Sequence, residues 1–212
     1  MSRGLGDVYK RQMPDPAQLI LVRHGETEWS VERKHTGRTD VPLTDDGRDD
    51  ARAIAGALRT FAIRRCFASP LSRAWETAQL GGLDPVRDDD LVEWDYGDYE
   101  GRTTDEIRRT VPGWSVWTHP MVGGETVDEV GARADRVIDR VLGLDGATAL
   151  VAHSHFLRIL AARWLELPAV EGRRFTLDTT SLSVLGWERE SRTIDRWNDP
   201  CEWGRPVPPV AR

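Results

Sequence analysis

Three short segments carry residue types that can do chemistry on an anionic substrate. They are Arg23-His24-Gly25-Glu26-Thr27, Ser69-Pro70-Leu71-Ser72-Arg73 and His153-Ser154-His155. Arginine presents a rigid fork of N–H donors that matches the oxygens of a phosphoryl group. Histidine can act as a nucleophile, an acid or a base near neutral pH. These residue types together predict a positively charged site for a phosphoryl group.

Each of the three segments follows a short apolar run. The runs span residues 19–22, 65–68 and 149–152. Continuous apolar runs of this length are typical of strands that are covered on both faces. The carboxyl ends of parallel strands meet at one edge of an open sheet, and ligands bind there. The three segments are therefore expected to converge at that edge.

Helical patterns separate these runs. Apolar residues recur at helical spacing over residues 44–58, 72–80, 125–142 and 156–165, and a short helix is expected over 104–109. Residues 180–188 and 193–198 favour a final strand pair. A shaped loop is expected over 93–101, which holds two glycines and four acidic residues. The alternation predicts a three-layer α/β/α fold with a mostly parallel central sheet.

Composition excludes several classes of protein. The chain has 212 residues and a formal net charge of −6, which argues against nucleic acid as the main partner. No apolar run approaches the ~18 residues of a membrane span. The two cysteines, Cys66 and Cys201, suit neither a disulfide framework nor a cysteine metal site. We expect a cytoplasmic protein, monomeric or homodimeric, that uses no metal or other cofactor.

The domain organisation is expected to be simple. Residues 1–12 look foreign to the fold, so we interpret them as a non-native extension and Met13 as the native start. We expect a single domain over residues 13–204. Prolines cluster in residues 205–212, which are expected to form a loose tail.

The three motifs together resemble those of the histidine phosphatase (phosphoglycerate-mutase-like) superfamily. Their order, spacing and expected positions at strand ends match that family over about residues 18–200. The segment 93–101, with Val116-Trp117-Thr118 and Gly124-Glu125-Thr126, resembles the branch of small acid phosphatases and sugar bisphosphatases. The cofactor-dependent mutases of the superfamily carry a longer insertion before the Gly-Glu-Ser/Thr motif.

The resemblance implies a role for each matching residue. His24 is implied as the nucleophile that accepts the phosphoryl group. Arg23, Arg73 and His153 are implied as the clamp around the phosphoryl oxygens. Glu93 is implied as the proton donor, which protonates the leaving alkoxide and then deprotonates the attacking water. The neighbouring acids Asp95 and Asp98 are alternatives for a share of that role.

Further substrate contacts are expected from Ser30, Thr36, Gly37, Tyr96, Arg102, Ser154 and His155. Ser30 and Thr36-Gly37 stand where the mutases contact phosphate, and Arg102 is a candidate for a second phosphate. Ser154 replaces the glycine that commonly follows the second histidine in this family. Serine would be strained there if the backbone needed a positive φ, whereas its hydroxyl is able to donate to a phosphate oxygen.

We therefore expect a metal-independent phosphomonoesterase that works through a phosphohistidine on His24. Its partner is expected to be a small phosphorylated metabolite: a sugar phosphate, a sugar bisphosphate, or a broad range of phosphomonoesters. The clustered acids disfavour a highly phosphorylated substrate such as inositol hexakisphosphate. A phosphoglycerate-type mutase is the alternative among enzymes. A catalytically impaired phospho-ligand-binding protein is the alternative outside them, and Ser154 is the one feature that favours it.

Overall fold

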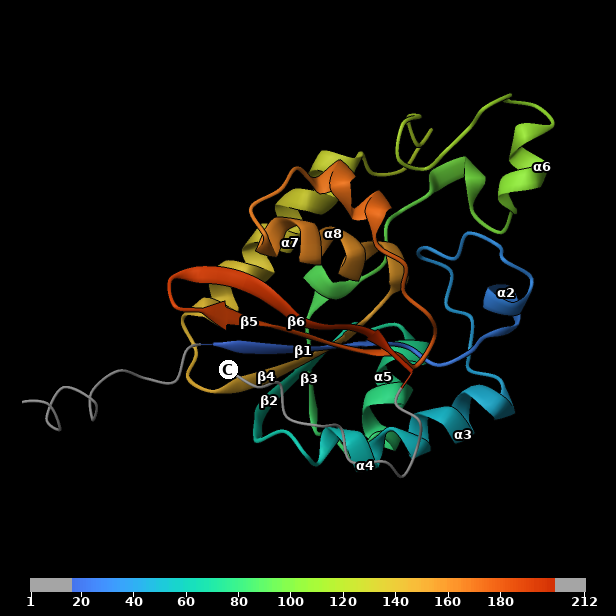
Figure 1. Ribbon diagram of the computed structural model, residues 1–212. Coiled ribbons are helices and arrows are strands. Elements are labelled where there is room, and N and C mark those ends of the chain that lie inside the picture. The colour runs from blue at the N-terminus through green and yellow to red at the C-terminus, as the bar shows by residue number, and fades with distance from the viewer. Residues whose placement is uncertain (1–16, 201–212) are drawn as a thin grey trace, which may run out of the picture.

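A six-stranded sheet with the order β3-β2-β4-β1-β5-β6 forms the centre of the computed structural model, which describes residues 17–200 (Figure 1). The first four strands in that order run parallel, while β5 and β6 are antiparallel to their neighbours. The prediction of a mostly parallel sheet is confirmed. The strands are β1 (Gln18–Arg23), β2 (Ile63–Ala68), β3 (Pro85–Arg87), β4 (Ala147–Ala152), β5 (Leu182–Glu188) and β6 (Ser191–Asp199).

Helices cover both faces of the sheet, which confirms the three-layer architecture (Figure 1). The central strands alternate between the two faces: Leu19 and Leu21 of β1 pack in one core cluster, and Ile20 and Val22 pack in the other. Burial on both faces is the reason for the continuous apolar runs. The helices are α2 (Glu28–Val31), α3 (Asp45–Ala53), α4 (Ala55–Leu58), α5 (Ser72–Leu80), α6 (Thr104–Arg108), α7 (Val127–Leu142) and α8 (Ser154–Trp164), with 3-10 turns η1 (Asp89–Leu91), η2 (Gly97–Tyr99) and η3 (Ala169–Arg174).

Three helix boundaries differ from expectation. The helix expected over 44–58 is divided at Ile54 into α3 and α4, although the backbone of Ile54 stays helical. The helix α7 begins two residues late because Thr126 is its N-cap, with a reciprocal capping box to Glu129. The helix α8 begins two residues early, at Ser154, because His153 occupies the N-cap position.

Strand register brings the predicted motifs together. Arg23, the last residue of β1, pairs with Ala152, the last residue of β4, so His24 and His153 follow adjacent strand ends. Ala68 of β2 pairs with Val151 on the other side of β4, which places Ser69 beside the same edge. The helices α2 and α6 lie beyond the carboxyl end of β1 (Figure 1).

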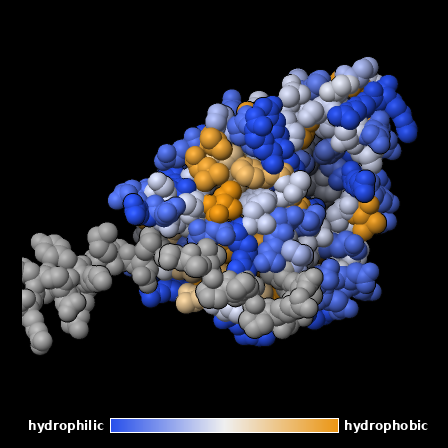
Figure 2. All heavy atoms as spheres, viewed as in Figure 1, coloured by the Kyte–Doolittle hydropathy of each residue, from blue (hydrophilic) through white to orange (hydrophobic). Residues whose placement is uncertain are grey.

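The surface seen in Figure 2 is mainly hydrophilic, with apolar side chains gathered over α8. Within residues 17–200 no helix has the length and apolar character needed to traverse a bilayer. The expected extension 1–12 and the expected tail 205–212 lie outside the described residues, as do both expected domain boundaries.

Candidate active site

His24 follows β1 directly and is only 5% exposed. Its backbone N–H donates to the Ala152 carbonyl of β4 at 3.0 Å, and the next N–H, of Gly25, donates to Thr77 Oγ1 of α5 at 2.9 Å. The ring nitrogen Nδ1 lies 2.7 Å from the Gly25 carbonyl oxygen. Because a carbonyl oxygen can only accept, Nδ1 carries the proton, and Nε2 of the neutral ring holds the free lone pair.

The electrostatic surroundings keep the His24 ring neutral. Burial lowers the pKa of His24 well below its ordinary value, and the positive charges of Arg73 and Arg23 lower this pKa further. A neutral imidazole with an available lone pair is the nucleophilic form. The ring can therefore attack an electrophile at neutral and at mildly acidic pH.

Arg73 is fully buried at the start of α5 and is held from two sides. Its Nε donates to His153 Nδ1 at 3.2 Å. Its two terminal nitrogens donate to three backbone carbonyls, those of Thr36 at 3.3 Å, Gly37 at 2.9 Å and Thr39 at 2.9 Å. The structure thus brings Thr36 and Gly37 to the site as supports of Arg73, through their backbone oxygens.

His153 is fully buried, and its ring centroid lies 5.1 Å from that of His24. Since Nδ1 accepts from Arg73, the proton of the neutral ring lies on Nε2, which donates to Ser69 Oγ at 2.8 Å. Burial lowers the pKa of His153 well below its ordinary value, and the charge of Arg73 adds to this effect. Ser69 belongs to a motif that the sequence singled out, but its support of His153 was not predicted.

Arg23 ends β1 and flanks His24 from the other side. One terminal nitrogen donates to the Leu177 carbonyl at 2.5 Å, whereas its Nε is buried without a partner among the described residues. A buried N–H without an acceptor is costly, and a phosphoryl oxygen would satisfy it. The same loop contacts His24, because the N–H of Thr180 donates to the His24 carbonyl at 3.2 Å. Thr180 has a left-handed backbone (φ 57°), so β5 begins at Leu182 and not at 180 as expected.

Glu93 is 4% exposed, and its carboxylate lies at the N-terminus of α8. Oε1 accepts from the N–H groups of Trp94 at 2.8 Å and Phe156 at 2.9 Å, and Oε2 accepts from that of His155 at 3.0 Å. The charge of Glu93 acts on half-buried Arg23 and on buried Arg73, and partly offsets the lowering of their pKa values by desolvation. This places the carboxylate near the clamp.

Tyr96 and His155 lie in an aromatic group next to Glu93. Tyr96 Oη is 2.6 Å from His155 Nδ1, and both rings pack against Trp94. Gly37 approaches this group so closely that a Cβ there would lie 2.6 Å from the Trp94 carbonyl oxygen and 3.1 Å from the Tyr96 ring. The need for glycine at this position follows from that approach. Trp117 and His35 complete the group.

Two expected contact residues, Ser30 and Arg102, are placed differently. The Ser30 hydroxyl is used in the capping box of α2, where it donates to the Thr27 carbonyl at 2.8 Å. The Arg102 guanidinium lies 6.0 Å from the centre of the Tyr99 ring and donates to the Glu106 carbonyl at 3.4 Å. Neither makes a polar contact with the clamp in the described part of the chain. Their roles stay predictions.

Ser154 is the first residue of α8 and does not have a positive φ. Serine is therefore not strained at this position, and the strain considered from the sequence is absent. Its hydroxyl makes no hydrogen bond within residues 17–200. The phosphate contact of Ser154 stays a prediction.

The sequence matches a known protein-family model, that of the histidine phosphatase superfamily (branch 1), over residues 19–200. The chain belongs to this superfamily. It is 41% identical over 184 residues to an acid phosphatase of Mycobacterium tuberculosis (strain ATCC 25618 / H37Rv), covering 84% of this chain and 90% of that relative. It is 36% identical over 184 residues to a sedoheptulose 1,7-bisphosphatase of Saccharomyces cerevisiae, covering 71% of this chain and 68% of that relative.

Two solved structures share the fold of this chain. The product of an open reading frame of Mycobacterium tuberculosis superposes with a TM-score of 0.83 at 39% identity, over 86% of this chain and 97% of that one. A mycobacterial glucosyl-3-phosphoglycerate phosphatase superposes with a TM-score of 0.77 at 29% identity, over 86% and 98% of the two chains. The predicted superfamily, its acid phosphatase and sugar bisphosphatase branch, and the fold are confirmed, and the chain is a histidine phosphatase family enzyme.

Proposed function

We propose that the protein hydrolyses small organic phosphomonoesters through a phosphohistidine on His24. The observation that carries this proposal is the state of His24. Its Nδ1–H is held by a backbone carbonyl, its ring is neutral, and the charges of half-buried Arg23 and buried Arg73 act on it. An imidazole fixed in this tautomer presents Nε2 to the phosphorus atom, and the arginines stabilise the charge on the phosphoryl oxygens.

The first step transfers the phosphoryl group to the enzyme. The Nε2 lone pair of His24 forms the N–P bond while the ester P–O bond breaks. The unpartnered Nε of Arg23 and the remaining terminal N–H of Arg73 donate to phosphoryl oxygens, and His153 joins them when its Nε2–H turns from Ser69 Oγ to a third oxygen. Glu93 takes up a proton with the anionic substrate and gives it to the leaving alkoxide, so an alcohol departs.

The second step returns the enzyme to its starting state. The Glu93 carboxylate takes a proton from a water molecule, whose oxygen attacks the phosphorus atom. The N–P bond breaks, inorganic phosphate leaves, and Nε2 of His24 regains its lone pair. Division into two displacements avoids a direct attack of water on the charged ester. No metal ion is needed in either step.

We propose a sugar phosphate or sugar bisphosphate as the substrate class, with broad acid phosphatase activity as the alternative. Tyr96 and His155, with Trp117 near them, offer flat and hydrogen-bonding groups beside Glu93, where the leaving alcohol must lie. The four acids of segment 93–101 disfavour a highly phosphorylated substrate. Relatives named as an acid phosphatase and as a sugar bisphosphatase agree with this range of substrates.

A mutase would use the same clamp but transfer the phosphoryl group back to the substrate, so the product decides between the two reactions. The full chain is incubated with sugar phosphates, sugar bisphosphates, phosphoglycerates and p-nitrophenyl phosphate in the presence of EDTA. We expect release of inorganic phosphate and no accumulation of an isomeric phosphoglycerate. An isomer without phosphate release would establish the mutase, and binding without turnover would establish the impaired binding protein.

The control is His24→Ala. We expect this variant to unfold at the temperature of the wild type and to release phosphate more slowly by a factor of at least ~10³, because it lacks the nucleophile. Turnover that persisted in a folded His24→Ala variant would contradict the phosphohistidine route. Turnover that stopped with EDTA would contradict the metal-independent mechanism.

A further inference from the structure

We propose that Arg133 of α7 is a positioning residue that holds Glu93 in the geometry required for proton transfer. The inference rests on the proposed function, since it concerns the proton donor of that reaction. Arg133 lies on the apolar side of α7, close to Val130, Ala134 and Val137, and is only 7% exposed. An arginine among buried apolar residues has a structural or functional reason to be there, because burying its charge is costly.

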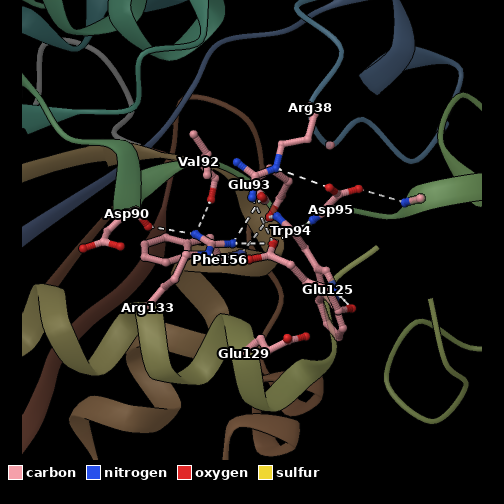
Figure 3. A network of polar contacts seen from close by, with 12 residues as sticks. Arg38, Asp90, Val92, Glu93, Trp94, Asp95, Glu125, Glu129, Arg133 and Phe156 are labelled. Carbon is pink, nitrogen blue, oxygen red and sulfur yellow. Dashed lines mark hydrogen bonds and ion pairs between the residues drawn. The ribbon is translucent and has the colours of Figure 1, made fainter. Parts of the chain in front are cut away.

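Arg133 binds the backbone that leads up to the proton donor. One terminal nitrogen donates to the carbonyls of Asp90 at 2.8 Å and Val92 at 2.9 Å, and the other donates to the carbonyl of Glu93 itself at 3.3 Å. Figure 3 shows the guanidinium directed at this stretch of chain, with the Phe156 ring against it. The ring centre lies 5.1 Å from the guanidinium carbon. Phe156 also donates its N–H to the Glu93 carboxylate.

Glu125 neutralises Arg133 and binds the two residues that follow Glu93, Trp94 and Asp95. Its two carboxylate oxygens accept from Arg133 at 2.8 and 2.9 Å, a bidentate ion pair. One of them also accepts from the Asp95 N–H at 3.0 Å, and the Glu125 carbonyl accepts from Trp94 Nε1 at 2.7 Å. The backbone on both sides of Glu93 is thereby held by one ion pair, between buried Arg133 and half-buried Glu125.

Arg38 joins this network to the phosphate clamp. Its guanidinium lies 3.3 Å from a Glu125 oxygen and 3.8 Å from an Asp95 oxygen. Arg38 stands between Gly37 and Thr39, whose carbonyls accept from Arg73. One loop therefore contacts both the residue that binds the phosphoryl group and the residues that orient the proton donor.

The effect of removing Arg133 on kcat/KM should depend on the leaving group of the substrate. An alkoxide is a poor leaving group and needs the proton from Glu93, whereas p-nitrophenolate departs without one. The second-order constant kcat/KM reports the steps up to departure of the leaving group, before hydrolysis of the phosphohistidine. Misplacement of Glu93 should therefore lower kcat/KM for alkyl phosphates far more than for p-nitrophenyl phosphate. Loosening of the fold alone would lower both constants alike.

The experiment measures kcat/KM of the full chain for a sugar phosphate and for p-nitrophenyl phosphate. For Arg133→Met we expect a fall of about 100-fold with the sugar phosphate, the lower end of what general acid catalysis contributes, and of about threefold or less with p-nitrophenyl phosphate. The matched control is Arg163→Met, which removes an arginine–aspartate pair between α8 and α7 remote from Glu93. It should leave the ratio of the two constants unchanged.

A second variant covers the case in which Arg133→Met does not fold because Glu125 loses its bidentate partner and keeps only Arg38. The double variant Arg133→Met/Glu125→Gln removes both charges and should show the same selective loss. Equal losses with both substrates, or a wild-type ratio in either folded variant, would overturn the positioning role. Absence of any phosphate release by the wild-type chain would instead overturn the proposed function, so the two failures are distinguishable.

Discussion

His24 is a histidine kept neutral by its surroundings, and this has a consequence for the pH dependence. Because burial and two arginines lower its pKa well below the ordinary 6.5, the nucleophile remains unprotonated as the pH falls below that value. We expect the acid limb of kcat/KM for p-nitrophenyl phosphate, corrected for the ionisation of the substrate, to lie well below pH 6.5. A loss of activity centred near pH 6.5 after that correction would contradict the neutral state of His24.

Glu93 is assigned both proton transfers, and the second can be isolated. In Glu93→Gln, p-nitrophenyl phosphate should still phosphorylate His24, because its leaving group needs no proton, but hydrolysis of the phosphohistidine should slow by about 100-fold or more. A burst of p-nitrophenolate approaching the enzyme concentration should then precede slow turnover, measured by rapid mixing. Glu129→Gln, at the exposed start of α7, is the matched control and should not create a burst.

At the scale of elements, helix termini stabilise the parts that carry the site. The Thr126 hydroxyl accepts from the Glu129 N–H at 3.2 Å, and the Glu129 carboxylate accepts from Thr126 at 2.8 and 2.9 Å. Thr126→Ala should lower the free energy of unfolding by ~1 kcal/mol, the usual contribution of such a cap. Thr126→Ser keeps the hydroxyl and should lose a few tenths at most. Chemical denaturation measures both, and equal losses would show that the methyl group, not the cap, is responsible.

At the scale of the whole molecule, several buried histidines couple stability to pH. The pKa of His35, between Tyr96 and Trp114, is lowered by burial to about 4, and those of His24, His153 and His155 are lowered in the same direction. Between about pH 6.5 and 4 the unfolded chain binds protons that the folded chain does not. The free energy of unfolding therefore decreases as the pH is lowered through that window, by at most about 3–4 kcal/mol for His35 alone.

A His35→Gln variant tests this coupling. It removes one of the titrating groups, so its unfolding free energy should fall less between pH 6.5 and pH 4.5 than that of the wild type. His119→Gln, which replaces a histidine outside this group, is the matched control. Calorimetry at the two pH values gives the comparison, and an unchanged pH dependence in His35→Gln would show that this ring is not buried in its neutral form.

The sequence alone predicted every strand except β3, most helices other than α2, and the residues expected in the clamp. Apolar runs and helical periodicity are local patterns, and parallel strands place their carboxyl ends at one edge whatever the details of packing. His24, Arg73 and His153 could therefore be expected to converge before any coordinates were known. The signal for Arg133 was also local, since it is a charged residue on the apolar side of α7, but its role could not be read from that position.

Only the tertiary structure decided how these side chains are held. The Leu177 carbonyl reaches Arg23, those of Thr36 and Gly37 reach Arg73, and Arg133 reaches Glu93 over separations of tens of residues or more. No local pattern encodes such contacts, because they depend on which loops meet once the strands have paired. The same reason explains Ser30, whose hydroxyl is taken by its own helix cap, and Ser154, whose backbone conformation was settled by the start of α8.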